Sequence, residues 1–256
     1  MIADEERFGT DPAATFRVNL SAVEERIVRA CQRSGRNRSD VRLLPITKTV
    51  PADILRYAFA AGIHDFGENK IQEAQSKKAE LGEMDINWSI VGHLQSNKVK
   101  YLCHFAREFH ALDSLRLADL LDKRLKREGR QLDVYVQVNT SGEESKFGLH
   151  PDALMPFIET LDQFEALRPR GLMTLALFSQ DMDKVRPCFR LLRRLRDQAV
   201  LRNAAVTELS MGMSGDFEEA IEAGANVVRV GQAIFGKRPT PDSLYWPGFA
   251  PEAGQS

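Results

Sequence analysis

Cysteine is scarce in this chain, with three in 256 residues. Cys31, Cys103 and Cys188 lie far apart and lack the close spacing of metal-binding or redox motifs. We expect them to be buried, reduced thiols, which favours a cytoplasmic protein.

Long hydrophobic runs and an excess of charge of one sign are also missing. No apolar run approaches the roughly 18 residues that indicate a transmembrane helix. The first ten residues are acidic and polar, unlike a signal peptide. The net charge of −1 argues against a general nucleic-acid binder. With 43% hydrophobic and 28% charged residues, the composition is that of a globular protein, and neither a membrane nor a nucleic acid is expected as its partner.

Strand-like and helix-like segments alternate along most of the chain. An amphipathic helix is expected first, at about 16–31. Apolar runs typical of parallel strands follow near 42–48, 63–66, 87–91, 108–111, 132–139, 168–173, 206–210 and 226–230. Helical segments are expected near 52–61, 70–81, 96–102, 114–128, 152–162, 182–202, 215–223 and 232–235. This order predicts an α/β fold, a single (β/α)8 barrel of TIM type with an extra N-terminal helix.

The alternative to a closed barrel is a doubly wound open sheet. The lack of Gly-x-Gly-x-x-Gly after the first strand weakens this alternative. Three regions are expected: a flexible N-terminal extension at 1–15, the barrel at 16–237 and a proline-rich tail at 238–256. The prolines of the tail exclude a helix or a central strand there.

Lys48 ends the first apolar run, directly before a predicted helix. An ammonium group at the end of a buried strand is partly desolvated, and desolvation lowers a lysine's pKa. A neutral amine can attack a carbonyl carbon. The alternative is a lysine that extends from the barrel mouth into water.

Polar residues and glycines gather at the carboxyl ends of the predicted strands, where barrels of this kind place their active sites. Ser214 and Gly231 follow the last two strands, where this fold usually binds phosphate. Arg229 stands between valines and needs an anion or a strong acceptor. The candidate site residues are Lys48, Asn69, His93, Ser210, Gly212, Met213, Ser214, Arg229, Gly231 and Gln232.

Ordinary structural roles remain open for these candidates. Ser214 is well placed as the N-cap of the helix that follows it. Gly212 and Gly231 can serve tight turns, and Asn69 can cap a helix. Arg229 can form a structural salt bridge.

Seven ordered motifs carry a family resemblance. They are Thr47-Lys48-Thr49, Phe66-Gly67-Glu68-Asn69, Gly92-His93-Leu94-Gln95-Ser96-Asn97-Lys98, Ser145-Lys146-Phe147-Gly148, Arg170-Gly171-Leu172-Met173, Leu209-Ser210-Met211-Gly212-Met213-Ser214 and Val228-Arg229-Val230-Gly231-Gln232-Ala233-Ile234-Phe235-Gly236. From about Leu43 to Lys237 the chain resembles the pyridoxal 5′-phosphate homeostasis proteins.

The resemblance implies a fold similar to the barrel domain of alanine racemase, with pyridoxal 5′-phosphate (PLP) as cofactor. It implies an aldimine, a Schiff base, between PLP and Lys48. It also implies that Ser214, the amides around Gly231 and Gln232 hold the phosphate, that Arg229 lies near the pyridine nitrogen, and that Asn69 lines the site. The sequence departs from the usual pattern at Ser89, where histidine or methionine is common, and at Gln232, where many members carry threonine or serine.

The implied function is cofactor homeostasis, meaning storage, buffering or delivery of PLP without established catalysis. Apo forms of PLP-dependent enzymes are the expected partners, and a monomer is expected. The alternatives are a PLP-dependent amino-acid racemase or lyase, and a class I aldolase that uses Lys48 without a cofactor. A cation at the ring nitrogen disfavours ring protonation and weakens the electron sink that carbanion chemistry needs. Racemisation also needs a second acid or base, for which His93 is the obvious internal candidate.

Overall fold

A computed structural model describes residues 4–237 of the chain, and parallel strands form its centre. The strands are β1 (Arg42–Pro45), β2 (Asp65–Glu68), β3 (Asn87–Ile90), β4 (Glu108–Leu112), β5 (Leu132–Gln137), β6 (Leu167–Met173), β7 (Glu208–Ser210) and β8 (Val227–Val230). They form one eight-stranded sheet in the order β1-β8-β7-β6-β5-β4-β3-β2. A bridge between Ile46 and Gly67 brings the two ends of this sheet together. The predicted (β/α)8 barrel is therefore confirmed.

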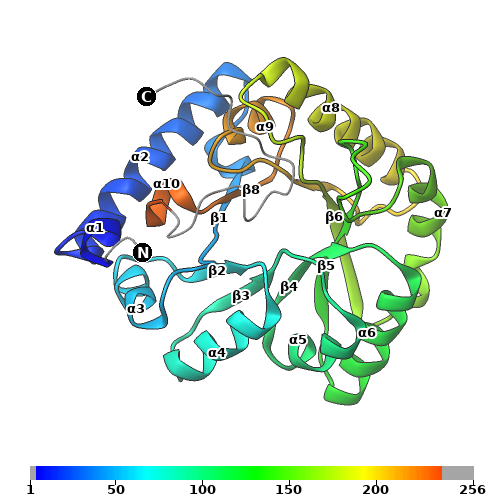
Figure 1. Ribbon diagram of the computed structural model, residues 1–256. Coiled ribbons are helices and arrows are strands. Elements are labelled where there is room, and N and C mark those ends of the chain that lie inside the picture. Colours follow the sequence, from blue (N-terminus) through cyan, green and yellow to red (C-terminus); the bar gives the residue numbers. More distant parts are fainter. Residues whose placement is uncertain (1–3, 238–256) are drawn as a thin grey trace.

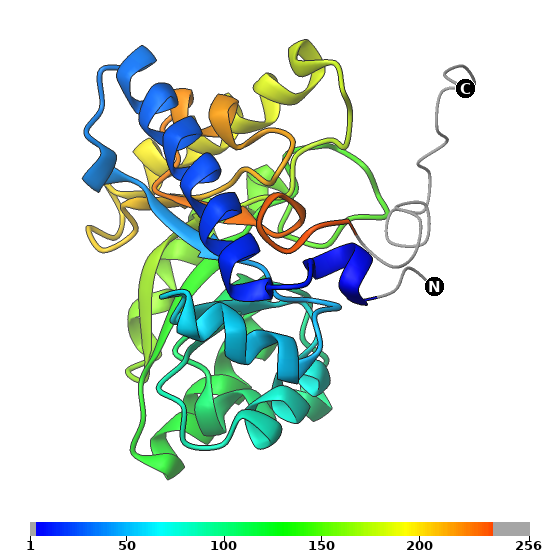
Figure 2. The same ribbon diagram turned by 90° about the vertical axis from the view of Figure 1, so that its left-hand side faces the viewer.

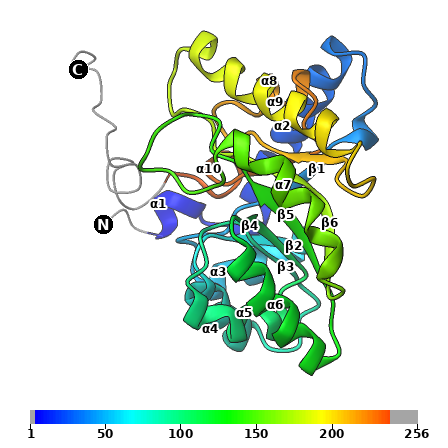
Figure 3. The same cartoon turned by 90° about the vertical axis from the view of Figure 1, so that its right-hand side faces the viewer.

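Helices alternate with the strands and surround them (Figure 1). They are α3 (Ala52–Ala60), α4 (Ile71–Leu81), α5 (Val99–Phe105), α6 (Leu115–Glu128), α7 (Leu154–Glu159), α8 (Met182–Ala199), α9 (Phe217–Glu222) and α10 (Gln232–Phe235). The local sequence sets their ends, as α6 illustrates: the Ser114 hydroxyl accepts from the Leu117 amide, and Gly129 ends the helix in the left-handed conformation. Helices α3 to α6 lie on one side of the barrel, opposite α8 and α9 (Figure 3).

The extra N-terminal helix is present as α2 (Pro12–Arg33), which is longer than the expected 16–31. The Asp11 carboxylate caps it by accepting from the Ala14 amide at 3.0 Å. Part of the segment expected to be a flexible extension forms α1 (Asp4–Phe8), and the Phe8 side chain is buried. The predicted tail at 238–256 lies outside the described residues.

Apolar side chains of the strands and helices form one continuous core. Glycine allows close approach between two strands, since a Cβ atom on Gly171 would lie 1.9 Å from the carbonyl oxygen of Glu208. Cys31, Cys103 and Cys188 are buried free thiols, as expected. Within residues 4–237, none of the helices combines the length and the apolar character that a membrane crossing demands.

Candidate functional site

A cavity of about 480 Å³ opens at the carboxyl ends of the strands. Its volume falls in the range typical of cofactor and ligand sites. Most of the predicted site residues line it, with apolar partners such as Leu175 and Phe178. These predicted residues are Lys48, Asn69, Met213, Ser214, Arg229, Gly231 and Gln232.

Lys48 is half-buried and lies on a loop between two threonines that are held by polar contacts. The Thr47 amide donates to the Gly67 carbonyl at 2.9 Å, and its hydroxyl donates to the Glu68 carboxylate at 2.6 Å. Thr49 adopts φ 65°, in the left-handed region. For a β-branched residue this conformation is unusual and costs about 1–3 kcal/mol. The loop that carries Lys48 is therefore strained and needs external support.

A buried cluster of charges supplies part of that support. The Lys77 ammonium donates to Glu68 at 2.6 Å, to Glu73 at 2.7 Å and to the Thr47 carbonyl at 2.8 Å. The same Glu73 oxygen accepts from the Thr49 amide at 2.7 Å. Burial raises the pKa of Glu68 to about 7, although Lys77 acts in the opposite direction. The cluster therefore fixes the backbone on both sides of Lys48.

Ser214 and the start of α10 form another part of the cavity lining. The Ser214 hydroxyl accepts from the Gly231 amide at 3.3 Å and from the Ala233 amide at 3.5 Å. The interpretation of Ser214 as a helix N-cap is wrong, because α9 begins at Phe217 and Asp216 takes the cap position. The longer loop lets Ser214 reach α10 instead. Backbone amides and a hydroxyl gathered in this way are donors suited to a phosphate group.

Arg229 is a buried cation that lines the cavity. It is 3% exposed, donates to the Ser210 hydroxyl at 2.8 Å and to the Thr174 carbonyl at 2.8 Å. Burial lowers the pKa of Arg229 to about 10, and the nearby charge of Asp216 acts against this decrease. The group is therefore still cationic at neutral pH. The strong acceptors that the sequence required are a hydroxyl and a backbone carbonyl.

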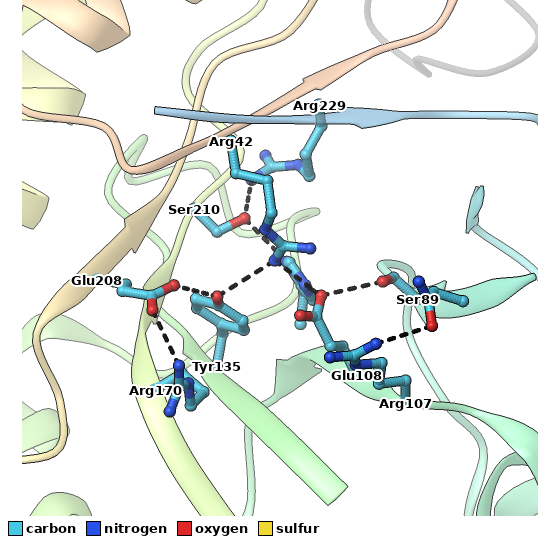
Figure 4. Close-up of polar contacts among 11 residues, drawn as sticks. Arg42, Ser89, Arg107, Glu108, Tyr135, Arg170, Glu208, Ser210 and Arg229 are labelled. Atoms are coloured by element: carbon cyan, nitrogen blue, oxygen red, sulfur yellow. Dashed lines mark hydrogen bonds and ion pairs between the residues drawn. The ribbon is translucent and has the colours of Figure 1, made fainter. Parts of the chain in front are cut away.

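A chain of hydrogen bonds continues from Arg229 into the barrel interior (Figure 4). The Ser210 hydroxyl lies 2.9 Å from Nδ1 of His110, and Nε2 of His110 lies 3.0 Å from Glu108. Burial lowers the pKa of His110, so its imidazole is neutral. Since Glu108 can only accept when ionised, Nε2 carries the proton and Nδ1 accepts from Ser210. The bonds then run in one direction, from Arg229 through Ser210 and His110 to Glu108.

Glu108, at the end of this chain, accepts hydrogen bonds from several donors. Arg42 donates to it at 2.9 Å and Ser89 at 3.0 Å. Although burial acts in the opposite direction, His110 and Arg42 hold the pKa of the Glu108 carboxyl well below its usual value. Ser89, where the sequence departs from the family pattern, is thus a donor within the barrel. Figure 4 also shows Tyr135 on the other side of Arg42.

Sequence reasoning missed this interior network because it considered only the ends of the strands. A signal was nevertheless present: Arg42, Glu108 and His110 are polar residues within apolar runs. Glu108 and His110 are two residues apart, so they point to the same face of β4.

Three predicted residues in the described chain lie outside the cavity lining: His93, Ser210 and Gly212. Ser210 supports Arg229 from below. His93 stacks on Phe147 with ring centroids 4.0 Å apart. Gly212 has φ 94°, and a Cβ atom there would lie 2.6 Å from that of Ala220, so its role is in packing.

The cavity residues fit an anionic aromatic aldehyde. The Lys48 amine can attack a carbonyl carbon, and the donors at Ser214 and Gly231 can hold a phosphate. Gly231 allows the backbone at the start of α10 to lie close to Ile46, because a Cβ atom on Gly231 would be 3.0 Å from the Ile46 carbonyl oxygen. The apolar side chains of Met213 and Leu175 suit a flat ring.

Comparisons with known proteins agree with this geometry. Residues 18–239 match the family model of the alanine racemase N-terminal domain. The pyridoxal phosphate homeostasis protein of Aquifex aeolicus is 42% identical over 220 residues, which cover 86% of this chain and 96% of the relative. The protein of that name from Pseudomonas aeruginosa is 40% identical, covering 88% of this chain and 96% of the relative. The structure of PipY from Synechococcus elongatus with PLP bound has a TM-score of 0.75 and 31% identity, covering 86% of this chain and 100% of PipY.

Proposed function

Because the chain belongs to the pyridoxal phosphate homeostasis protein family, we propose that it binds PLP in the cavity and stores, buffers or delivers this cofactor. One observation carries the proposal: Lys48, Arg229 and Ser214, from three different parts of the chain, line the same cavity. These three residues match three parts of PLP. The Lys48 amine suits the aldehyde, the Arg229 cation suits the ring nitrogen, and the donors at Ser214 suit the phosphate.

The family resemblance implies a role for each residue, and the position of each in the cavity lining supports that role. Lys48 attaches the cofactor covalently. Ser214, Gln232 and the amides of Gly231 and Ala233 hold the phosphate. Arg229 faces the ring nitrogen, and Asn69 lines the site. When bound, the cofactor supplies an electrophilic aldehyde carbon and an electron-withdrawing ring.

A carrier is favoured over the alternative of an amino-acid racemase or lyase. Ser210 and Thr174 hold Arg229 in place, and a fixed cation at the ring nitrogen disfavours its protonation. His93, the candidate second acid or base, lies outside the cavity lining and stacks on Phe147. Apo forms of PLP-dependent enzymes as recipients, a monomeric state and a cytoplasmic location remain predictions.

Transfer to an apo-enzyme tests the proposed function. Purified protein loaded with PLP is mixed with an apo-enzyme that needs PLP, in the presence of a phosphatase that destroys free cofactor. Enzyme activity should recover with the loaded protein and not with Lys48→Ala treated in the same way. No recovery, or recovery equal to that given by free PLP in the same mixture, contradicts a delivery role.

Proton exchange distinguishes the carrier from the alternative enzyme. The loaded protein is incubated with common amino acids in deuterated water. Negligible deuterium incorporation at the α-carbon is expected. Rapid deuterium incorporation would contradict the carrier function and indicate a racemase or lyase.

A further inference from the structure

The short helix α1 lies at the same end of the barrel as the cavity. Figure 2 shows α1, in dark blue, beside the orange-red segment at the end of α10. The two are in close contact, because a Cβ atom on Gly236 would lie 2.6 Å from the carbonyl oxygen of Arg7. This helix precedes the region matched by the family model, which begins at residue 18. It therefore lies outside the region that the family model matches.

Aromatic packing anchors α1 in this position. Phe8 is fully buried and meets Phe16 of α2 edge to face, with ring centroids 6.2 Å apart. Phe16 in turn meets Phe235 of α10 at 5.3 Å. The Arg7 guanidinium lies over the Phe8 ring at 4.6 Å. These contacts fix the residue that α1 presents to the cavity, which is Arg7.

Arg7 contacts the loop that carries Lys48. Its Nη1 donates to the Thr49 carbonyl at 2.6 Å, and its Nη2 donates to the Thr49 hydroxyl at 2.9 Å. Thr49 is the β-branched residue in the left-handed conformation, and Glu73 accepts from its amide on the other side. A planar guanidinium that binds two oxygens of one residue fixes its orientation more firmly than a single hydrogen bond would.

We propose that Arg7 is a positioning residue of the cofactor site: by holding Thr49 it keeps the Lys48 amine directed into the cavity and slows the loss of bound PLP. The part of this inference that concerns PLP rests on the proposed function. The part that concerns the loop does not, because the contacts between Arg7 and Thr49 belong to the protein itself.

The experiment compares Arg7→Ala and Arg7→Lys with a matched control, Arg17→Ala, in the full chain. Arg17 is an exposed arginine on the neighbouring helix α2. The first measurement is amide hydrogen exchange of residues 47–50 in the cofactor-free protein. Loss of two hydrogen bonds at a net value of about 1 kcal/mol each predicts roughly thirtyfold faster exchange in Arg7→Ala.

The second measurement is the rate at which PLP dissociates from the loaded protein. Arg7→Ala should release it roughly tenfold faster than wild type. Arg7→Lys keeps the charge, so its dissociation rate should lie between those of wild type and Arg7→Ala. Arg17→Ala should match wild type in both measurements. Circular dichroism and thermal unfolding show whether the barrel stays folded in each variant.

Three outcomes would overturn the inference. The first is wild-type exchange at residues 47–50 together with wild-type release in Arg7→Ala. The second is a lower melting temperature without any change in this loop, which would indicate a purely structural role. The third is an equal effect of Arg17→Ala. If wild type binds no PLP, the proposed function fails, while the exchange measurement still decides the role of Arg7 in the loop.

Discussion

His110 links the protonation of the barrel interior to the cavity. It is fully buried between Ser210 and Glu108. The centroids of the His110 and Tyr135 rings lie 4.1 Å apart. Its neutral form is the one that completes the chain of hydrogen bonds from Arg229. If the imidazole were protonated, Nδ1 could no longer accept from Ser210. Acid conditions are therefore expected to weaken the support of Arg229 and the stability of the fold together.

The pH dependence of stability tests this role. Burial lowers the folded-state pKa of His110 below its ordinary value of 6.5, so the unfolded chain binds more protons below that pH. The contribution to stability is present above pH 6.5 and is lost as the pH falls, at up to about 1.4 kcal/mol per pH unit. Between about pH 7 and pH 5, His110→Asn should therefore lose less free energy of unfolding than wild type, as measured in urea. Parallel curves for the two proteins would show that His110 does not titrate on unfolding.

At the scale of elements, the loop after β7 and the start of α10 work as one unit. The sequence predicted a helix at 215–223 and a site after the last two strands. It did not predict that α9 begins only at Phe217, after Asp216, or that the Ser214 hydroxyl contacts the amides at the start of α10. Local spacing could not show this, because both serine and aspartate are good N-cap residues.

Ser214→Ala tests whether this unit holds a phosphate. The variant should bind PLP more weakly by about 1.5–3 kcal/mol, roughly tenfold to a hundredfold in Kd, because it loses a charge-assisted hydrogen bond. Binding of pyridoxal, which lacks the phosphate, should hardly change. Titrations with both ligands check this difference. Equal losses for both ligands would assign Ser214 a structural role only.

At the scale of the molecule, the strand and helix pattern was sufficient to predict the barrel. Each predicted strand overlaps an observed one, since apolar runs and turn residues act locally. The strand-end rule also brought Lys48, Ser214 and Arg229 to one cavity. The interior network was not predictable in this way. Arg42, Glu108 and Ser210 come from strands far apart in the sequence, and they meet only because the barrel brings their inward faces together.

The most direct measurement of the central claim is the location of the covalent attachment. Protein titrated with PLP is reduced with borohydride, digested and analysed by mass spectrometry. The account predicts a reduced PLP adduct on Lys48 in wild type, and neither the adduct nor the visible absorption in Lys48→Arg, which keeps the charge but not the nucleophilic amine. An adduct on another lysine, formed with unchanged yield in Lys48→Arg, would contradict the account.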